Sequence, residues 1–126
     1  MNEYVQVMKE GHIGRLTITR ADKRNALNAE VVRELKASFE ALDADTEIRV
    51  IVLTGEGPVF CAGADLAYLQ MINDNSVLEN ARDSEALMAL MYGIRSSVTP
   101  TIARINGPAI AGGFGLALTC DILVSS

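Results

Sequence analysis

The sequence has 126 residues, 49% hydrophobic and 21% charged, a composition typical of one globular domain. Its formal net charge of −5 argues against nucleic-acid binding, which needs a basic face, but does not exclude a small anionic ligand held by a few cations or backbone donors. No apolar run reaches the roughly 18 residues that a membrane span requires, and the first ten residues lack the pattern of a secretory signal. We therefore expect no nucleic-acid or membrane partner, and a cytoplasmic protein or one in an organelle matrix.

The two cysteines and the single histidine limit the available chemistry. Cys61 and Cys120 lie in apolar or glycine-rich surroundings, so we expect reduced thiols in the core rather than a disulfide framework. With His12 as the one histidine, a zinc site of histidines and cysteines and a Ser-His-Asp triad are both disfavoured. We expect no metal and no resident cofactor.

The first part of the chain predicts two strands and then an amphipathic helix. Apolar residues within 4–8 precede a turn signal at 11–14, and residues 16–19 alternate between apolar and polar types. After a polar loop, Asn28 is a candidate N-cap for a helix that ends in the polar stretch 43–47. The apolar positions of this helix recur at helical spacing, and charged residues occupy its other faces: Val31, Val32, Leu35, Phe39 and Leu42 against Glu30, Arg33, Glu34, Lys36 and Glu40.

The rest of the chain alternates strands and helices, which indicates an α/β fold with short crossovers. The apolar run from Ile48 to Leu53 is typical of a parallel strand covered on both faces. The chain stops directly after an apolar strand, so we expect a fragment, or a chain completed by a partner segment, that folds poorly alone. The further expected elements are a short helix from Asp65, a helix over 77–95, a strand at 101–105, a helix opening at 111–115 and a strand at 121–124.

Two glycine-containing loops, residues 59–66 and 106–116, hold the chemical signal. Each follows an expected buried strand and leads into an expected helix N-terminus, where the first N–H groups have no helical acceptor. Two such ends that converge would aim two donors at one developing negative charge, each worth roughly 3 kcal/mol. Either loop alone is more often a plain turn. The second is neither a dinucleotide fingerprint nor a P-loop, because its glycine spacing differs and no lysine follows.

Several ordered segments resemble the enoyl-CoA hydratase/isomerase (crotonase) family over nearly the whole chain. They are Asn25-Ala26-Leu27-Asn28, the strand at 48–55, a first signature at 60–66, and a second signature from Pro100 through Asn106-Gly107 and Ala111-Gly112-Gly113 to Cys120-Asp121-Ile122. The resemblance implies a crotonase-like α/β fold, a spiral of β-β-α units shared with the Clp-type proteases. Residues 1–126 would form the N-terminal portion of a single such domain, incomplete at its C-terminal end.

The resemblance also implies an enzyme whose substrate is an acyl-CoA thioester, with coenzyme A as part of that substrate. In the family two backbone N–H groups hold the thioester carbonyl and stabilise an enolate-like intermediate, and by position these belong to Ala64 and Gly112. Family members act in fatty acid metabolism as trimers, often paired into hexamers, and we expect the same here. The residues expected to contact CoA are Lys23, Arg24, Ala26, Leu27, Ala62, Asp65 and Leu66.

Gly115 departs from the family pattern. Hydratases with two catalytic glutamates place one at this position, and a glycine cannot act as a general acid or base. The family's other glutamate would fall beyond Ser126. The resemblance therefore implies a hydratase or double-bond isomerase that uses one carboxylate, and it leaves open a CoA-binding subunit without catalysis. A serine peptidase of the same fold is less well supported, because the histidine lies in an early turn.

Acidic residues elsewhere are not expected to replace the missing glutamate. Asp65, at a helix start, is expected to cap that helix rather than act as an acid. Glu79, Asp83 and Glu85 lie on the helix expected over 77–95, where charged side chains usually face solvent.

Overall fold

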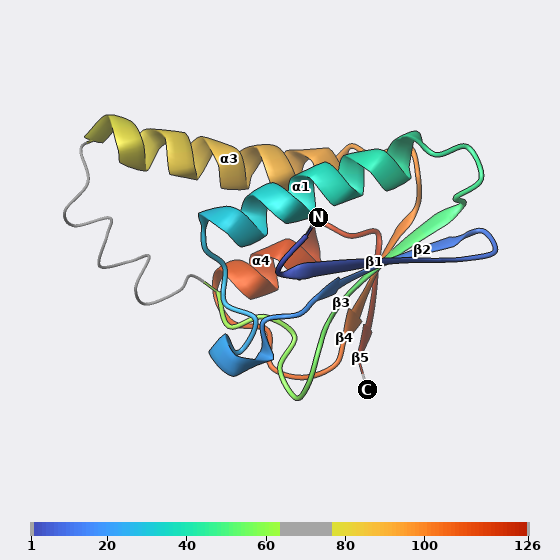
Figure 1. Cartoon of the computed structure of the whole chain (residues 1–126), viewed down its shortest axis with the longest axis horizontal. Coiled ribbons are helices and arrows are strands. Elements are labelled where there is room, and N and C mark those ends of the chain that lie inside the picture. The colour runs from blue at the N-terminus through green and yellow to red at the C-terminus, as the bar shows by residue number, and fades with distance from the viewer. Residues whose placement is uncertain (1, 64–76, 126) are drawn as a thin grey trace.

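One mixed five-stranded sheet forms the framework of the molecule (Figure 1). The computed structural model describes residues 2–63 and 77–125, and for residues 77–84 the backbone alone. β1 pairs antiparallel with β2, and β2 to β5 are mutually parallel neighbours. The strands lie side by side in chain order: β1 (Val5–Glu10), β2 (Ile13–Ile18), β3 (Val50–Gly55), β4 (Thr101–Ile105) and β5 (Ile122–Ser125).

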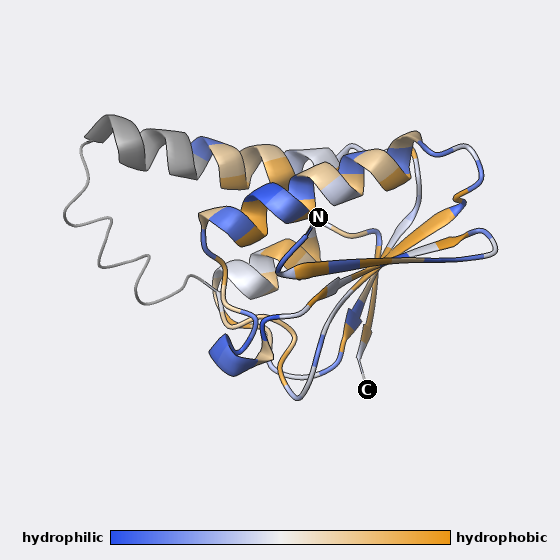
Figure 2. Cartoon of the chain, viewed as in Figure 1, coloured by the Kyte–Doolittle hydropathy of each residue, from blue (hydrophilic) through white to orange (hydrophobic). Residues whose placement is uncertain are grey.

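Helices cover one face of this sheet. α1 (Ala29–Ala44) and α3 (Val77–Arg95) lie side by side, and α4 (Gly112–Leu118) packs on β4 beneath them (Figure 1). Leu35 of α1, Leu90 of α3 and Leu116 of α4 are buried in the core between helices and sheet. Hydrophilic residues colour much of α1 in Figure 2. The largest fully buried side chains include Leu16, Ile18, Leu35, Leu42, Ile51, Phe60, Leu90 and Leu116.

The predicted secondary structure is largely confirmed, with small shifts at the boundaries. The Asn28 side chain accepts a hydrogen bond from the Val31 N–H at 2.9 Å, which is the expected N-cap of α1. The hairpin turn is shorter than expected, because Ile13 already pairs with Glu10. The helix over 77–95 and the strand at 101–105 match α3 and β4. The helix expected from Asp65 lies outside the described residues.

No described helix has the length and hydropathy to cross a membrane.

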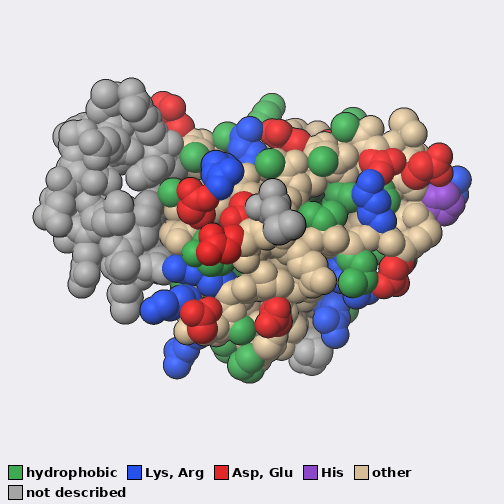
Figure 3. Space-filling view, in the orientation of Figure 1, with side chains coloured by type: hydrophobic (Ala, Val, Ile, Leu, Met, Phe, Trp, Pro, Cys, Tyr) green, Lys and Arg blue, Asp and Glu red, His purple; other side chains and the backbone are tan. Residues whose placement is uncertain are grey.

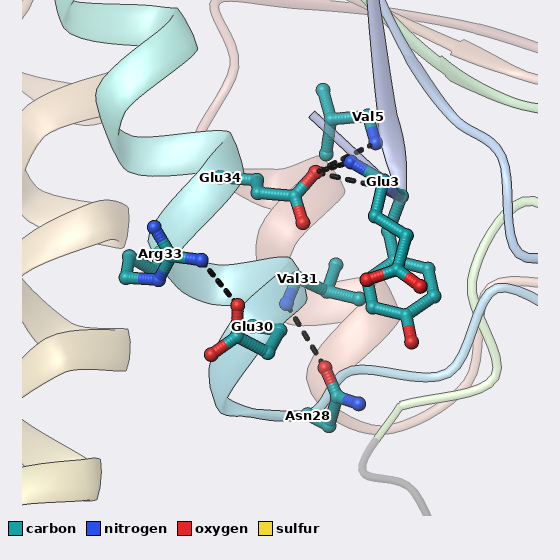
Figure 4. A network of polar contacts seen from close by, with 8 residues as sticks. Glu3, Val5, Asn28, Glu30, Val31, Arg33 and Glu34 are labelled. Atoms are coloured by element: carbon teal, nitrogen blue, oxygen red, sulfur yellow. Dashed lines mark hydrogen bonds and ion pairs between the residues drawn. The ribbon is translucent and has the colours of Figure 1, made fainter. Parts of the chain in front are cut away.

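The sequence places Glu34 on the polar faces of α1, and for this residue the prediction is wrong. It is 4% exposed, and its Oε1 accepts hydrogen bonds from the backbone N–H groups of Glu3, Tyr4 and Val5 at 2.8, 2.8 and 3.2 Å (Figure 4). Three donors replace the water that the carboxylate loses on burial. Glu34 therefore ties the start of β1 to the middle of α1.

The β3 strand is covered fully on one face, not on two as its apolar run suggested. Ile51 and Leu53 face the helices and are 1% and 4% exposed. Val52, on the opposite face, is only half-buried. We call this opposite face the open face, defined by the row of strand partners Arg15, Val52, Ile102 and Ile122.

Candidate functional site

Three loops gather at one edge of the sheet, at the lower left of Figure 1. They follow β2, β3 and β4, whose parallel alignment brings their carboxyl ends together. The first loop contains the short 3-10 helix η1 (Ala21–Lys23). The second spans residues 56–63 and the third spans 106–111. Ligands of parallel α/β sheets bind outside these strand ends, so this edge is the candidate site.

The two glycine loops meet at this edge, as the sequence predicted. Cys61 and Ala109 form an isolated parallel bridge, and the Ile110 N–H donates to the Cys61 carbonyl at 3.0 Å. Gly63 lies against the start of α4, because a Cβ placed on it would be 3.5 Å from the Gly112 nitrogen. A Cβ on Gly113 would collide with the Cys61 carbonyl, so glycine is required there for the close approach.

The Gly112 N–H is a donor that has no acceptor among the described residues. Gly113 and Gly115 donate to Ile110 and Ala111 at 2.8 and 3.0 Å, whereas within the described residues no acceptor is recorded for Gly112. Gly112 is the first residue of α4, where helical acceptors are missing. The second predicted donor, Ala64, lies outside the described residues, as do Asp65 and Leu66.

Ala111 holds a strained backbone conformation directly before that donor. Its φ is 50° and its ψ is −114°, a region that residues with a Cβ rarely adopt and that costs on the order of 1–3 kcal/mol. The ψ of Ala111 sets the plane of the peptide that contains the Gly112 N–H. The strained residue is therefore the one that orients the candidate donor.

The predicted CoA-contacting residues of the early loop lie next to Gly63. The Leu27 N–H donates to the Gly63 carbonyl at 2.6 Å, and the Ala62 N–H donates to the Arg24 carbonyl at 3.1 Å. Lys23 and Arg24 are both exposed, so their cations are available to a ligand. Figure 2 shows η1 as a hydrophilic turn.

The predicted CoA-contacting residues differ in how deeply they are buried. Ala26 and Leu27 are buried, and Ala62 is half-buried. The structure thus brings together five of the seven residues assigned to CoA, while the other two lie outside its described ranges.

Two asparagines shape the edge, and the sequence alone did not reveal their role. Asn25 is fully buried, and its side chain bonds the backbone of Arg20, Glu56 and Val59. The Asn106 side chain accepts from the Gly55 N–H at 3.1 Å and donates to carbonyls of the second loop. The one available signal was an asparagine after each of two strands, where amide side chains often bond nearby backbone.

An apolar cavity of about 480 Å³ opens beside Gly112. It lies between α1 and α3, and charged side chains with ion pairs stand on its α1 side: Arg33 pairs with Glu30 and Lys36 with Glu40. These pairs are exposed and contribute little stability. The lining residues are Leu27, Asn28, Ala29, Val32, Arg33, Lys36, Ala37, Glu40, Ala86, Leu87, Ala111 and Gly112.

The cysteines are buried thiols, which confirms the predicted reduced core. Both Cys61 and Cys120 are free, and burial raises the pKa of each, that of Cys120 to about 11. A thiol whose pKa is raised stays protonated near neutral pH and is a weak nucleophile. Cys61 precedes Gly63 by two residues in the chain and, as a protonated thiol, is not expected to act as a nucleophile in the site.

His12, the one histidine of the sequence, lies away from the glycine loops. His12 is in the β1–β2 turn, at the opposite end of β2 from the candidate site, where its Nδ1 is 2.7 Å from the Glu47 carbonyl. A serine peptidase is therefore disfavoured. Glu85 is exposed on α3, as expected, while the side chains of Glu79 and Asp83 lie outside the described set. Among the described residues, a Cβ on Gly115 would touch the Met91 methyl alone, at 3.4 Å.

Charge is distributed without a strong local bias over the face of the molecule drawn in Figure 3. Acidic and basic side chains are interspersed on the face drawn in Figure 3. Within residues 2–63 and the described part of 77–125, no group of three or more His, Cys, Asp or Glu residues could hold a metal ion.

The arrangement of sheet, helices and loops is that of the crotonase fold. The chain superimposes on a crotonase from Legionella pneumophila with a TM-score of 0.94 at 38% identity, covering 97% of this chain and 47% of that one. It superimposes on an enoyl-CoA hydratase from Polaromonas sp. JS666 with a TM-score of 0.91 at 36% identity, covering 97% and 48%. The predicted fold class is confirmed.

The chain belongs to the enoyl-CoA hydratase/isomerase family, whose model matches residues 8–126. A Thermus thermophilus protein provisionally named as an enoyl-CoA hydratase is 43% identical over 120 residues, which cover 95% of this chain and 47% of that protein. 4-chlorobenzoyl coenzyme A dehalogenase-2 of an Arthrobacter species is 34% identical over 125 residues, 98% and 45% of the two chains. The chain spans about half the length of the curated relatives it matches.

Proposed function

We propose that this chain supplies the donor site of an enzyme that performs acyl-CoA thioester chemistry through an enolate-like intermediate. The observation that supports this most is the contact between Gly63 and Gly112, beside a Gly112 N–H that has no acceptor among the described residues. Family membership supports the same substrate class.

The proposed chemistry needs donors for a thioester oxygen. When a base removes a proton next to the carbonyl, or water adds to a conjugated double bond, the electron pair moves onto that oxygen. N–H groups of Gly112 and Ala64 would stabilise this charge, each by roughly 3 kcal/mol. Collapse of the enolate with proton uptake at carbon completes either an isomerisation or a hydration. The apolar cavity beside Gly112 has room for an acyl group.

The CoA part of the substrate would lie along the early loop. Lys23 and Arg24 are exposed cations that suit its phosphates. Backbone near Ala26, Leu27 and Ala62 would line the path from the phosphates to the thioester. Asp65 and Leu66 complete the proposed set on the basis of family resemblance.

Gly115 favours an isomerase or a one-carboxylate hydratase, and it also supports a second candidate. A CoA-binding subunit without catalysis would keep the loops and cations but lack turnover. The dehalogenase relative is named for a further reaction of a CoA thioester, so other substrates belong in the assay. CoA binding without turnover of any enoyl-CoA or aroyl-CoA thioester would favour the binding subunit.

We further propose a cytoplasmic enzyme of fatty acid metabolism that assembles as a trimer or hexamer and uses no cofactor apart from the CoA of its substrate. Family resemblance is what supports these points.

The proposed donor is tested by Gly112→Pro in the full-length protein. Proline is tolerated at the first position of a helix, and it removes the N–H, so turnover should fall on the order of 100-fold or more. Gly112→Ala keeps the N–H, and among the described residues the atom nearest to its Cβ would be the Gly63 Cα at 4.0 Å, so its loss should stay below about 10-fold. Equal turnover of wild type and a folded proline variant would refute the assignment.

A further inference from the structure

The Asn25 amide is a buried connector between two loops of the site. Asn25 is 0% exposed, and its Oδ1 accepts the Arg20 N–H at 2.9 Å. Its Nδ2 donates to the carbonyls of Glu56 and Val59 at 2.9 and 2.8 Å. One side chain thus satisfies backbone groups of the first loop and of the second loop.

The Val59 carbonyl extends this connection to the third loop. It accepts from Asn25 and also from the Asn106 Nδ2, at 3.2 Å. The Pro108 carbonyl of the third loop in turn accepts from the Phe60 N–H at 3.0 Å. The three loops at the sheet edge are therefore joined through a short series of hydrogen bonds.

The conformation of the first loop depends on the same residue. Arg24 and Asn25 both have left-handed φ values, 55° and 56°, which side chains with a Cβ adopt at a cost. This reversal directs the Arg24 carbonyl to the Ala62 N–H and the Leu27 N–H to the Gly63 carbonyl. The buried amide of Asn25, together with these two backbone hydrogen bonds, therefore holds the loop in place relative to Gly63.

We propose that Asn25 is a positioning residue that holds Lys23 and Arg24 at a fixed place relative to Gly63, so that the nucleotide end of a CoA thioester binds while its carbonyl reaches the glycine junction. This inference rests on the proposed function. It predicts that Asn25 acts on the part of the ligand that only CoA possesses.

Two variants of the full-length protein test this role. Asn25→Asp keeps the acceptor for Arg20 but replaces both donors by an oxygen facing two carbonyls. Asn25→Gly removes the amide yet tolerates the left-handed φ, so it guards against a variant that fails to fold. Binding of CoA and of pantetheine, which lacks the nucleotide, is measured by calorimetry, and kcat and KM are measured for one enoyl group on each carrier.

Both variants should weaken CoA binding and raise KM for the CoA thioester about 10-fold or more, while pantetheine binding and kcat change less than about 3-fold. Glu34→Gln is the matched control, since it disturbs a buried hydrogen-bonded side chain away from the loops, and its CoA affinity should equal that of wild type. An equal loss for CoA and pantetheine, or no loss for either, would overturn the proposal.

A failure of the proposed function can be distinguished from a failure of the role proposed for Asn25. If the wild-type protein binds CoA but turns over no thioester, the catalytic proposal is wrong. The comparison of CoA and pantetheine binding by the variants then still tests the role of Asn25. Wild type that binds CoA no better than pantetheine overturns the role of Asn25 together with that of Lys23 and Arg24, while turnover of the pantetheine thioester would leave the donor site intact.

Discussion

Gly112 and Gly113 are adjacent glycines, and the structure explains the lack of a side chain differently at each position. At Gly113 the Cys61 carbonyl occupies the space of a side chain, so the residue is glycine for packing. At Gly112 nothing described lies closer to a Cβ position than the Gly63 Cα, at 4.0 Å. The space at Gly112 is open toward the cavity, which is what a ligand carbonyl approaching its N–H requires.

Cys120 gives a prediction at the scale of one residue. Its folded-state pKa of about 11 exceeds the ordinary value of 9.0, mainly because burial disfavours the thiolate. The folded protein then holds this proton more tightly than the unfolded chain, so the stability it contributes is present below pH 9 and lost as pH rises through 11. The loss should be roughly 2–3 kcal/mol.

The measurement is the free energy of unfolding in urea between pH 8.5 and 11, for wild type and Cys120→Ala. The variant should lose less stability over this interval than wild type. The same alkaline slope in both proteins would show that the thiol is not responsible.

At the scale of elements, α1 is held by one contact that is local in the sequence and by one that is distant. Asn28 caps it locally, through Val31. Glu34 joins it to residues about thirty positions earlier, at the start of β1. The first contact is a cap that a sequence can reveal, and the second is a tertiary contact that fixes β1 on the helix layer.

Glu34 gives the prediction for this scale. Glu34→Ala leaves three backbone N–H groups of the β1 start without their acceptor and should cost about 3 kcal/mol or more in unfolding free energy. Glu34→Gln keeps one oxygen acceptor and should cost about 1–2 kcal/mol. Glu40→Ala, on the exposed face of the same helix, should change stability by less than about 0.5 kcal/mol. Chemical unfolding of the three variants checks this order, and a neutral Glu34→Ala would contradict the account of Figure 4.

The sequence predicts elements whose periodicity is local. α1, α3 and β4 follow from spacing, capping and a proline before the strand. It does not predict Glu34, because a charged residue on a helix normally faces water and its partners come from another strand. The role of Asn25 is also out of reach, since its acceptors at 56 and 59 become neighbours only when β2 and β3 pair.

The convergence of the glycine loops was predictable because both follow neighbouring parallel strands, whose carboxyl ends share one edge. The direction of the Gly112 N–H was not, because it depends on the strained ψ of Ala111, which no sequence pattern specifies. The assignment of residues to CoA came from family resemblance and stays a prediction.

At the scale of the whole molecule, the described chain exposes apolar side chains on β5, at the edge of the sheet, and on α4. Ile122 and Val124 on β5 are 54% and 50% exposed. Phe114 and Leu118 on α4 are each 49% exposed. Patches of this kind mark surfaces that other protein covers, or that associate without it.

The polypeptide of residues 1–126 alone should therefore fold poorly. We expect it to bind a hydrophobic dye strongly and to self-associate, because the open face and α4 leave apolar side chains in water. Calorimetry with analytical ultracentrifugation checks this. A sharp cooperative melt of a monomer without dye binding would show that the core is complete as it stands.

The donation of the Gly112 amide to a thioester carbonyl is tested most directly by isotope-edited infrared spectroscopy of a bound acyl-CoA labelled with 13C at that carbonyl. In the full-length protein the carbonyl stretch should move to lower frequency than in free solution, because hydrogen bonds weaken the C=O bond, and Gly112→Pro should reverse much of that shift. A bound carbonyl that vibrates at the frequency of the free thioester would contradict the donor site.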